Sequence, residues 1–125
     1  MKTILVTGSS SGIGKSTAIK FVKAGWNVVS WGRRFKKMEA WKNNLPLTDQ
    51  KRIFIQCVDV MSASQVTEAI QLIPENFKVI DLLVNNAGLA LGKSPIHEGL
   101  IKDWEQMIDT NLKGLLYVTK VISTE

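Results

Sequence analysis

Short apolar runs alternate with segments of helical periodicity along the chain. The first run is apolar at consecutive positions, which is typical of a strand buried on both faces of a sheet. The predicted strands span residues 2–7, 27–31, 52–58 and 79–84. Apolar residues recur at helical spacing between these runs and after the last of them. The predicted helices span residues 14–24, 35–44, 63–73 and 103–122.

Strands that alternate with helices at intervals of about 25 residues predict βαβ units on a parallel sheet. The expected fold class is therefore α/β, a Rossmann-type doubly wound parallel sheet or its first half, with right-handed crossovers. The expected strand order is 3-2-1-4. A chain of 125 residues can bury one modest core, and this one contains no repeat or linker. We therefore assign residues 1–125 to one domain.

Several residues are assigned to the interior from the pattern alone. The apolar face predicted for the first helix comprises Ile13, Ala18, Phe21 and Val22. Cys57 is expected to be a small core residue on the third strand. As the single cysteine it cannot form an internal disulfide, which favours a reducing, cytoplasmic setting. No signal peptide is recognised at the start of the sequence.

Charge and composition exclude several function classes. The formal net charge of +5 could attract an anionic partner. No DNA-binding motif or interleaving of basic and aromatic residues accompanies it, so no nucleic-acid partner is expected. No apolar stretch approaches the roughly 18 residues that span a bilayer, so no membrane partner is expected. No histidines, cysteines and carboxylates have ligand spacing, so no metal site is expected.

A glycine-rich segment at residues 7–14 follows the first predicted strand and leads into the first predicted helix. Backbone amides that carry no side chains, at a helix N-terminus, form a site for a diphosphate. The spacing of Gly8, Gly12 and Gly14 fits a dinucleotide turn with a longer first interval than usual. Glycines required only for the local fold are the alternative.

A P-loop is the rival interpretation of this turn. That motif needs a glycine, four residues, and then Gly-Lys-Ser or Gly-Lys-Thr. Gly14-Lys15-Ser16 matches the second half, but counting back five positions places Ser9 where the glycine should be. The mismatch of one residue argues against an ATPase or a GTPase.

Two arginines at the end of the second predicted strand indicate which dinucleotide is bound. In dinucleotide folds a carboxylate at this position binds the ribose of NAD, whereas an arginine accommodates the 2′-phosphate of NADP. This chain has Gly32 followed by Arg33 and Arg34. A solvated basic helix start is the alternative, although cations there oppose the helix dipole. NADP is therefore the predicted cofactor.

Four motifs, taken in order, resemble those of the short-chain dehydrogenase/reductase family. They are Thr7-Gly8-x-x-x-Gly12-x-Gly14, Cys57-Val58-Asp59-Val60, Asn85-Asn86-Ala87-Gly88 and Asn111-Leu112-Lys113-Gly114. The segment 85–120 is similar, more specifically, to the NADP-dependent 3-hydroxy acid dehydrogenases of that family, which oxidise serine, allo-threonine and related β-hydroxy acids. Residues 88–92 and 103–105 carry most of this likeness.

The resemblance implies a site for NADP. The implied cofactor-binding residues are Gly8, Ser9, Ser10, Ser11, Gly12, Ile13, Gly14, Arg33, Arg34, Asp59, Val60, Asn86, Ala87 and Gly88. Asp59 and the Val60 backbone would contact adenine. Some relatives carry a basic residue before the second glycine, where this chain has Ser11, so recognition of the 2′-phosphate would rest on the arginine pair.

Asn111 is the one catalytic residue that the resemblance implies within the chain. It falls on the apolar stripe of the last predicted helix, so its amide is expected to be buried and to need partners. In the family the corresponding asparagine bends the helix and holds a water near the active lysine. A core asparagine with its hydrogen bonds satisfied is the alternative.

Family catalysis also uses a serine and a Tyr-x-x-x-Lys pair, whose lysine lowers the pKa of the tyrosine. Tyr117 is the only tyrosine, and Lys120 follows it by three residues instead of four. We therefore interpret this pair as structural and expect the catalytic groups to lie beyond Glu125.

On this interpretation the chain is about the N-terminal half of an oxidoreductase. The whole enzyme would transfer a hydride between NADP and a small 3-hydroxy acid or a similar alcohol or ketone, and relatives imply a homodimer or homotetramer. The chain alone is expected to bind NADP weakly without turnover. A truncated, non-catalytic nucleotide-binding module is the alternative.

Overall fold

The computed structural model describes residues 1–87, 101, 116, 119 and 122. Its centre is a parallel four-stranded sheet in the order β3-β2-β1-β4. The strands are β1 (Thr3–Val6), β2 (Asn27–Gly32), β3 (Ile53–Cys57) and β4 (Leu82–Val84). The helices are α1 (Gly12–Lys23), α2 (Phe35–Asn43), α3 (Leu47–Gln50), α4 (Ala63–Gln71) and the 3₁₀ helix η1 (Glu75–Phe77). The predicted fold class and strand order are confirmed.

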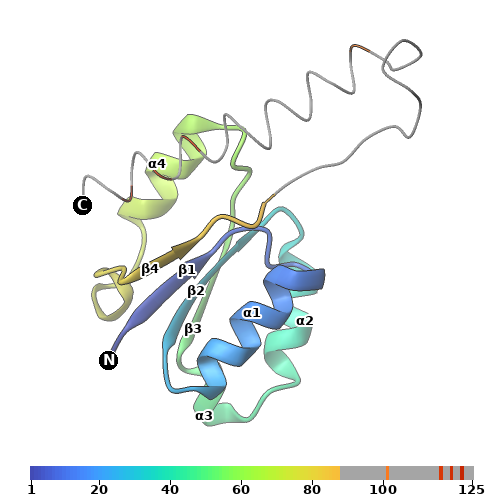
Figure 1. Cartoon of the computed structure of the whole chain (residues 1–125), viewed down its shortest axis with the longest axis vertical. Helices are drawn as coiled ribbons and strands as arrows, with labels where there is room; N and C mark the ends of the chain where they lie inside the picture. The colour runs from blue at the N-terminus through green and yellow to red at the C-terminus, as the bar shows by residue number, and fades with distance from the viewer. Residues whose placement is uncertain (88–100, 102–115, 117–118, 120–121, 123–125) are drawn as a thin grey trace.

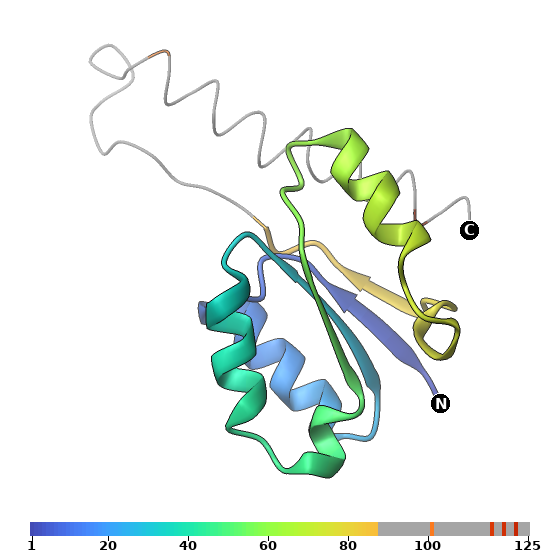
Figure 2. The ribbon, with the colours of Figure 1, turned by 180° about the vertical axis from the view of Figure 1, so that it is seen from behind.

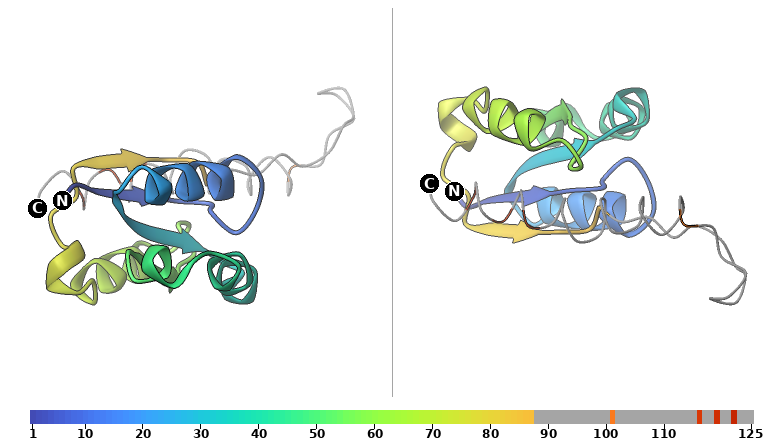
Figure 3. Two further views of the ribbon diagram at one scale, coloured as in Figure 1. Left: turned by 90° about the horizontal axis from the view of Figure 1, so that it is seen from below. Right: turned by 90° about the horizontal axis from the view of Figure 1, so that it is seen from above.

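Helices cover both faces of the sheet, with α1 and α2 on one face and α4 on the other (Figures 1 and 2). Alternate residues of each strand point to opposite faces. Ile4, Val6 and Val28 pack in the cluster that contains α1 and α2 residues. Leu5 and Val29 pack in the cluster that contains α4 residues. The strands are also twisted, with β2 lying obliquely to β1 (Figure 3).

The buried face of α1 differs from the predicted one at its first position. Gly14, Ala18 and Val22 are buried at intervals of four residues, so they define the side that packs on the sheet. Ile13 precedes Gly14 by one position and is 77% exposed. The assignment of Ile13 to the core is therefore wrong. The helix ends before Gly25, whose φ of +95° and bond to Val22 O close its last turn.

Cys57 is exposed, so its expected place in the core is also wrong. It is the last residue of β3, and β3 is the edge strand beside β2. Only one edge of such a strand is covered by a neighbouring strand. The burial of β3 accordingly falls from Ile53, which is 4% exposed, to Cys57.

The start of α4 also fixes the loop that follows β3. Ser62 Oγ accepts a hydrogen bond from Gln65 N at 3.3 Å, as its predicted capping position requires. The Gln65 side chain does not return this bond to Ser62, as it would in a complete capping box. It instead accepts from Asp59 N at 2.9 Å. Gln65 therefore holds the segment that connects β3 to α4.

The last predicted strand and the last predicted helix are described in part. Strand β4 begins at Leu82, and Val79 precedes it in an exposed position. The helix predicted at 103–122 lies outside the described residues, except that Leu116, Thr119 and Ile122 are helical. No helix within the described ranges has the length and apolar character needed to cross a bilayer.

Candidate cofactor-binding site

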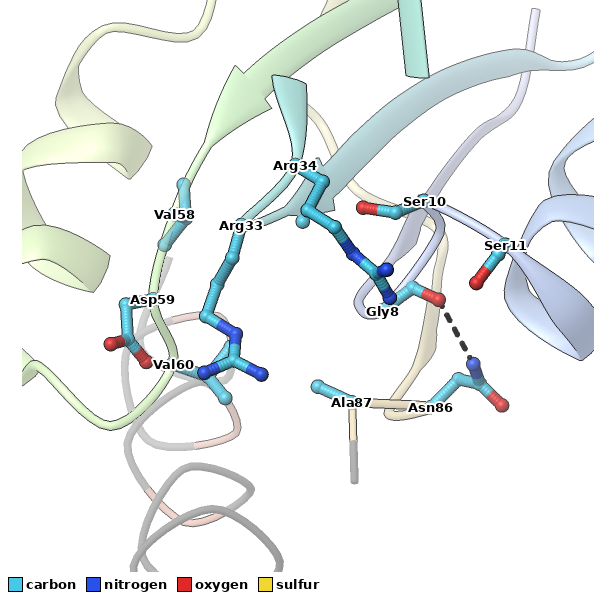
Figure 4. Close-up of a pocket in the computed structure, with 11 residues that line it drawn as sticks. Gly8, Ser10, Ser11, Arg33, Arg34, Val58, Asp59, Val60, Asn86 and Ala87 are labelled. Carbon is cyan, nitrogen blue, oxygen red and sulfur yellow. Dashed lines mark hydrogen bonds between the residues drawn. The ribbon is translucent and has the colours of Figure 1, made fainter. Parts of the chain in front are cut away.

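A cavity of about 240 Å³ opens at the carboxyl ends of the strands (Figure 4). Its walls come from the turn after β1, from the end of β2 and from the segments after β3 and β4. The eleven lining residues are Gly8, Ser10, Ser11, Gly32, Arg33, Arg34, Val58, Asp59, Val60, Asn86 and Ala87. Parallel sheets of this type bind ligands outside the carboxyl ends of their strands, which is where this cavity lies.

Two glycines allow three segments to meet at one corner of the cavity. Gly8 has a φ of +64°, and a Cβ on it would lie 2.8 Å from Ala87 Cα. A Cβ on Gly14 would overlap Gly8 O and would lie 2.6 Å from Asn86 Nδ2. Only residues without side chains permit these approaches. The glycine spacing thus brings the start of α1 against the turn after β1 and the loop after β4.

Hydrogen bonds that involve Thr7 and Asn86 hold this corner together. The amides of Asn86 and Ala87 both donate to Thr7 Oγ1 at 2.9 Å. Asn86 Nδ2 donates to Gly8 O at 3.2 Å. The sequence motifs contain these residues, but the clamp made by Thr7 was not predicted from them. The sequence feature that could have predicted this clamp is a hydroxyl residue at the end of one strand together with an Asn-Asn-Ala-Gly turn at the end of the neighbouring strand.

Ser9 lies behind the wall of the cavity and is completely buried. Its amide and its hydroxyl both donate to Trp31 O at 3.0 Å. Its carbonyl accepts from Trp41 Nε1, also at 3.0 Å. No polar group of Ser9 is left over for a ligand. Ser9 thus supports the turn from inside, and its expected contact with the cofactor stays a prediction.

The N-terminus of α1 offers amides without a competing acidic group. The first turn of the helix has no acidic residue, and Ser11, at the N-cap, makes no capping bond with its side chain. Gly12 has a φ of +62°, and a Cβ there would meet nothing within 4 Å. This end of the helix therefore combines the positive end of the helix dipole with open space, which suits an anion.

The two arginines enter the cavity in different directions. Arg34 points toward the turn at Gly8, whereas Arg33 points toward Val60 (Figure 4). In the part of the chain that the structure describes, the single ion pair joins Arg52 to Asp49, so neither cavity arginine is paired with a carboxylate. The cavity thus has two positive side chains available for an anion.

Most of the predicted site residues meet at this cavity. Those that line it are Gly8, Ser10, Ser11, Arg33, Arg34, Asp59, Val60, Asn86 and Ala87. Gly12, Ile13 and Gly14 lie in the first turn of α1 and do not line it. Gly88 and Asn111 lie outside the described residues. Gly32 and Val58 line the cavity but were not predicted, although both stand at strand ends.

Metal-binding groups give no second site in the described ranges. Among those residues, no three His, Cys, Asp or Glu side chains gather closely enough to hold a metal ion.

The strand order, the glycine turn and the cavity at the strand ends define a Rossmann-type nucleotide-binding domain. The family model for short chain dehydrogenases matches residues 2–125. The chain therefore belongs to the short-chain dehydrogenase family, as its motifs predicted. This membership overturns the P-loop interpretation of the glycine turn.

Named relatives lie in the predicted subgroup of the family. The serine 3-dehydrogenase of Agrobacterium fabrum is 44% identical over 117 residues, which are 94% of this chain and 45% of that enzyme. The NADP-dependent 3-hydroxy acid dehydrogenase YdfG of Salmonella typhi is 40% identical over 119 residues, which are 95% of this chain and 46% of that enzyme. The chain thus spans a little under half the length of these relatives.

Solved structures give the same likeness. The closed form of serine dehydrogenase complexed with NADP⁺ matches with a TM-score of 0.90 and 38% identity, over 96% of this chain and 47% of that one. ElxO with NADP bound matches with a TM-score of 0.88 and 32% identity, over 98% of this chain and 49% of that one.

Proposed function

We propose that this chain binds NADP in the cavity at the strand ends, as the cofactor-binding part of an oxidoreductase. The observation that carries the proposal is the pair of arginines after β2, which face the cavity without a carboxylate partner in the described residues. Guanidinium groups bind phosphate through parallel hydrogen bonds, and the position holds no acidic residue that would favour NAD.

The adenosine end fits the side of the cavity made by the segments after β2 and β3. Asp59 is held there by two hydrogen bonds, since its Oδ1 accepts from Met61 N at 3.0 Å and its amide donates to Gln65 Oε1 at 2.9 Å. Val58 and Val60 provide apolar surface next to it. This combination of a fixed carboxylate and aliphatic side chains suits an adenine ring, which has both a polar edge and apolar faces.

The diphosphate fits the glycine turn and the start of α1. The open space at Gly12 and the amides of the first helical turn provide room and hydrogen-bond donors for an anion. Asn86 and Ala87 close the cavity on the far side, held by Thr7. A nucleotide in this orientation would run from the arginine pair across the turn toward the loop after β4.

When bound, NADP would supply a hydride acceptor or donor, and we propose that the substrate is a small 3-hydroxy acid or a similar alcohol or ketone. Support comes from the names of the relatives, a serine 3-dehydrogenase and a 3-hydroxy acid dehydrogenase. We further propose a cytoplasmic enzyme that works as a homodimer or homotetramer, with Asn111 in the catalytic site.

Removing either cavity arginine should weaken NADPH binding selectively. Arg33→Ala and Arg34→Ala are each expected to raise the Kd for NADPH by about ten- to a hundredfold, because a hydrogen bond to a charged group contributes about 1.5–3 kcal/mol and about 1.4 kcal/mol is tenfold in Kd. The Kd for NADH should change little, since NADH has no 2′-phosphate. Titration of both nucleotides by calorimetry measures the two constants.

Lys37→Ala is the matched control for the arginine variants. It removes one positive charge from an exposed position on α2 that does not line the cavity. Its Kd values for both nucleotides should stay at those of the unchanged chain. If Arg33→Ala and Arg34→Ala weakened NADPH and NADH equally, the assignment of NADP would be contradicted.

Turnover tests whether the chain alone is catalytically active. We expect the 125-residue chain to bind NADP⁺ and to show no serine-dependent production of NADPH. A steady-state assay that follows the appearance of NADPH measures this. Serine oxidation by the chain alone would contradict the expectation that the catalytic serine, tyrosine and lysine lie elsewhere.

A further inference from the structure

One tryptophan joins the helix that follows the arginine pair to the glycine turn. Trp41 lies on α2, is 4% exposed and belongs to the core cluster beneath α1 and α2. Its indole Nε1 donates to Ser9 O at 3.0 Å. A buried carbonyl needs a hydrogen-bond donor, and here the donor is a side chain from another element.

This bond sets the direction of the peptide group between Ser9 and Ser10. A trans peptide is planar, so its carbonyl and its N–H point in opposite directions. The chain has no cis peptide bond within the described residues. Because the carbonyl of Ser9 is directed at the Trp41 indole in the core, the amide of Ser10 is directed away from the core. Ser10 itself lines the cavity.

The preceding peptide group is held at both ends. Gly8 O accepts from Asn86 Nδ2, and Ser9 N donates to Trp31 O. The amide of Ser10, by contrast, has no acceptor among the described residues. The peptide group between Gly8 and Ser9 is therefore fixed at both ends. The next one, between Ser9 and Ser10, is held among the described residues only by the bond that its carbonyl accepts from Trp41.

Ser10 lies at the arginine end of the cavity. A Cβ on Gly32 would overlap Ser10 Oγ, so the side chain of Ser10 rests against the last residue of β2. Arg34, two residues further on, extends its guanidinium toward the same turn (Figure 4). An anion held by Arg34 would therefore lie near Ser10, whose amide is directed away from the core.

We propose that Trp41 is a positioning residue for recognition of the 2′-phosphate. Its indole fixes the peptide between Ser9 and Ser10, so that the Ser10 amide donates to the phosphate held by Arg34. The inference rests on the proposed binding of NADP in this cavity. It distinguishes Trp41 from an ordinary core residue, whose loss would weaken all nucleotides to the same extent through stability.

The test compares two nucleotides that differ only in the phosphate of interest, adenosine 2′,5′-bisphosphate and adenosine 5′-monophosphate. Trp41→Phe keeps an aromatic ring and removes the indole donor. It is expected to raise the Kd for the bisphosphate about fivefold, the effect of about one net hydrogen bond, and to leave that for the monophosphate unchanged. Equal weakening of both nucleotides, or of neither, would overturn the proposal.

Trp31→Phe is the matched control, because it removes the same donor from the opposite face of the sheet. The indole of Trp31 is also buried and donates to Gln56 Oε1 at 2.8 Å, away from the glycine turn. Its substitution should lower the thermal midpoint and leave the ratio of the two Kd values unchanged. A changed ratio in this control would show that lost core packing alone alters the selectivity, which would overturn the role of Trp41.

The amide resonance of Ser10 provides a second readout. In the ¹⁵N-labelled chain this resonance should shift on addition of the bisphosphate and should stay in place with the monophosphate. Failure of the bisphosphate to bind would refute the proposed function. Binding without a shift at Ser10 would refute only the inference, as would an unliganded Trp41→Phe chain with an unaltered Ser10 resonance.

Discussion

Replacing Gly14 with alanine should abolish measurable NADPH binding and lower the free energy of unfolding by about 3 kcal/mol, the upper end of the cost of overpacking a filled interior. The added Cβ would overlap Gly8 O and would approach Asn86 Nδ2 to 2.6 Å. The nearest atom belongs to the backbone, so no side-chain rotation removes the overlap. Urea denaturation and calorimetric titration measure the two effects.

Gly25→Ala separates this steric effect from the general cost of losing a glycine. Gly25 has a φ of +95°, and a Cβ there would meet nothing within 4 Å. It lies after α1, at the end remote from the cavity. The substitution should cost about 1 kcal/mol through its backbone conformation and leave NADPH binding intact. Should Gly14→Ala behave in the same way, the close approach of α1 to the turn is not required for binding.

Thr7→Val should be the second most damaging change. Valine has the shape of threonine but cannot accept a hydrogen bond, so the amides of Asn86 and Ala87 would both lose their acceptor. We expect a loss of about 2 kcal/mol of unfolding free energy, because an unsatisfied donor costs about 1–3 kcal/mol when buried and these two are partly accessible. NADPH binding should weaken with it, since both residues line the cavity.

Thr7→Ser is the control for this clamp. It retains the hydroxyl and removes only a methyl group, at a cost of about 1 kcal/mol for the lost burial. Urea denaturation of the two variants, analysed by linear extrapolation, compares the hydroxyl with the methyl group. A serine variant as unstable as the valine variant would contradict the importance of the two hydrogen bonds.

The sheet could be predicted from the sequence because its signal is local and repeated. Each strand is a compact apolar run, and each crossover has helical spacing. The alternation predicts a doubly wound parallel sheet, and the order 3-2-1-4 is that of the Rossmann-type member of this class. The short helix α3 and the 3₁₀ helix η1 were not predicted. Each covers one turn, and a single turn has too few residues to show a period.

The two errors of burial have a common cause. Ile13 and Cys57 are apolar residues of α1 and β3, yet one stands at the start of its helix and the other at the end of its strand. Apolar character predicts burial only where a neighbouring layer covers the position. Where each layer ends depends on the packing of other elements, and this cannot be read from the local pattern.

For the site, the sequence predicted which residues come together, but not which of them line the cavity and which support it from the core. The family resemblance implied Ser9, Ser10 and Ser11 together as ligand contacts. In the structure the first is completely buried and bonded to Trp31 and Trp41, while the other two line the cavity. The role of Trp41 in particular depends on a contact across 32 positions, which no local pattern contains.

The clamp at Thr7 also has a consequence for folding. Its bonds join residues 79 and 80 positions apart, so the clamp forms only once β4 lies beside β1. An intermediate that lacks β4 would have the glycine turn without its opposite wall. Any ligand of the cavity would thus bind only the completely folded chain. It would stabilise that state by mass action, by about 2.7 kcal/mol at a concentration of one hundred times its Kd. The supply of nucleotide would then govern how long the chain survives proteolysis.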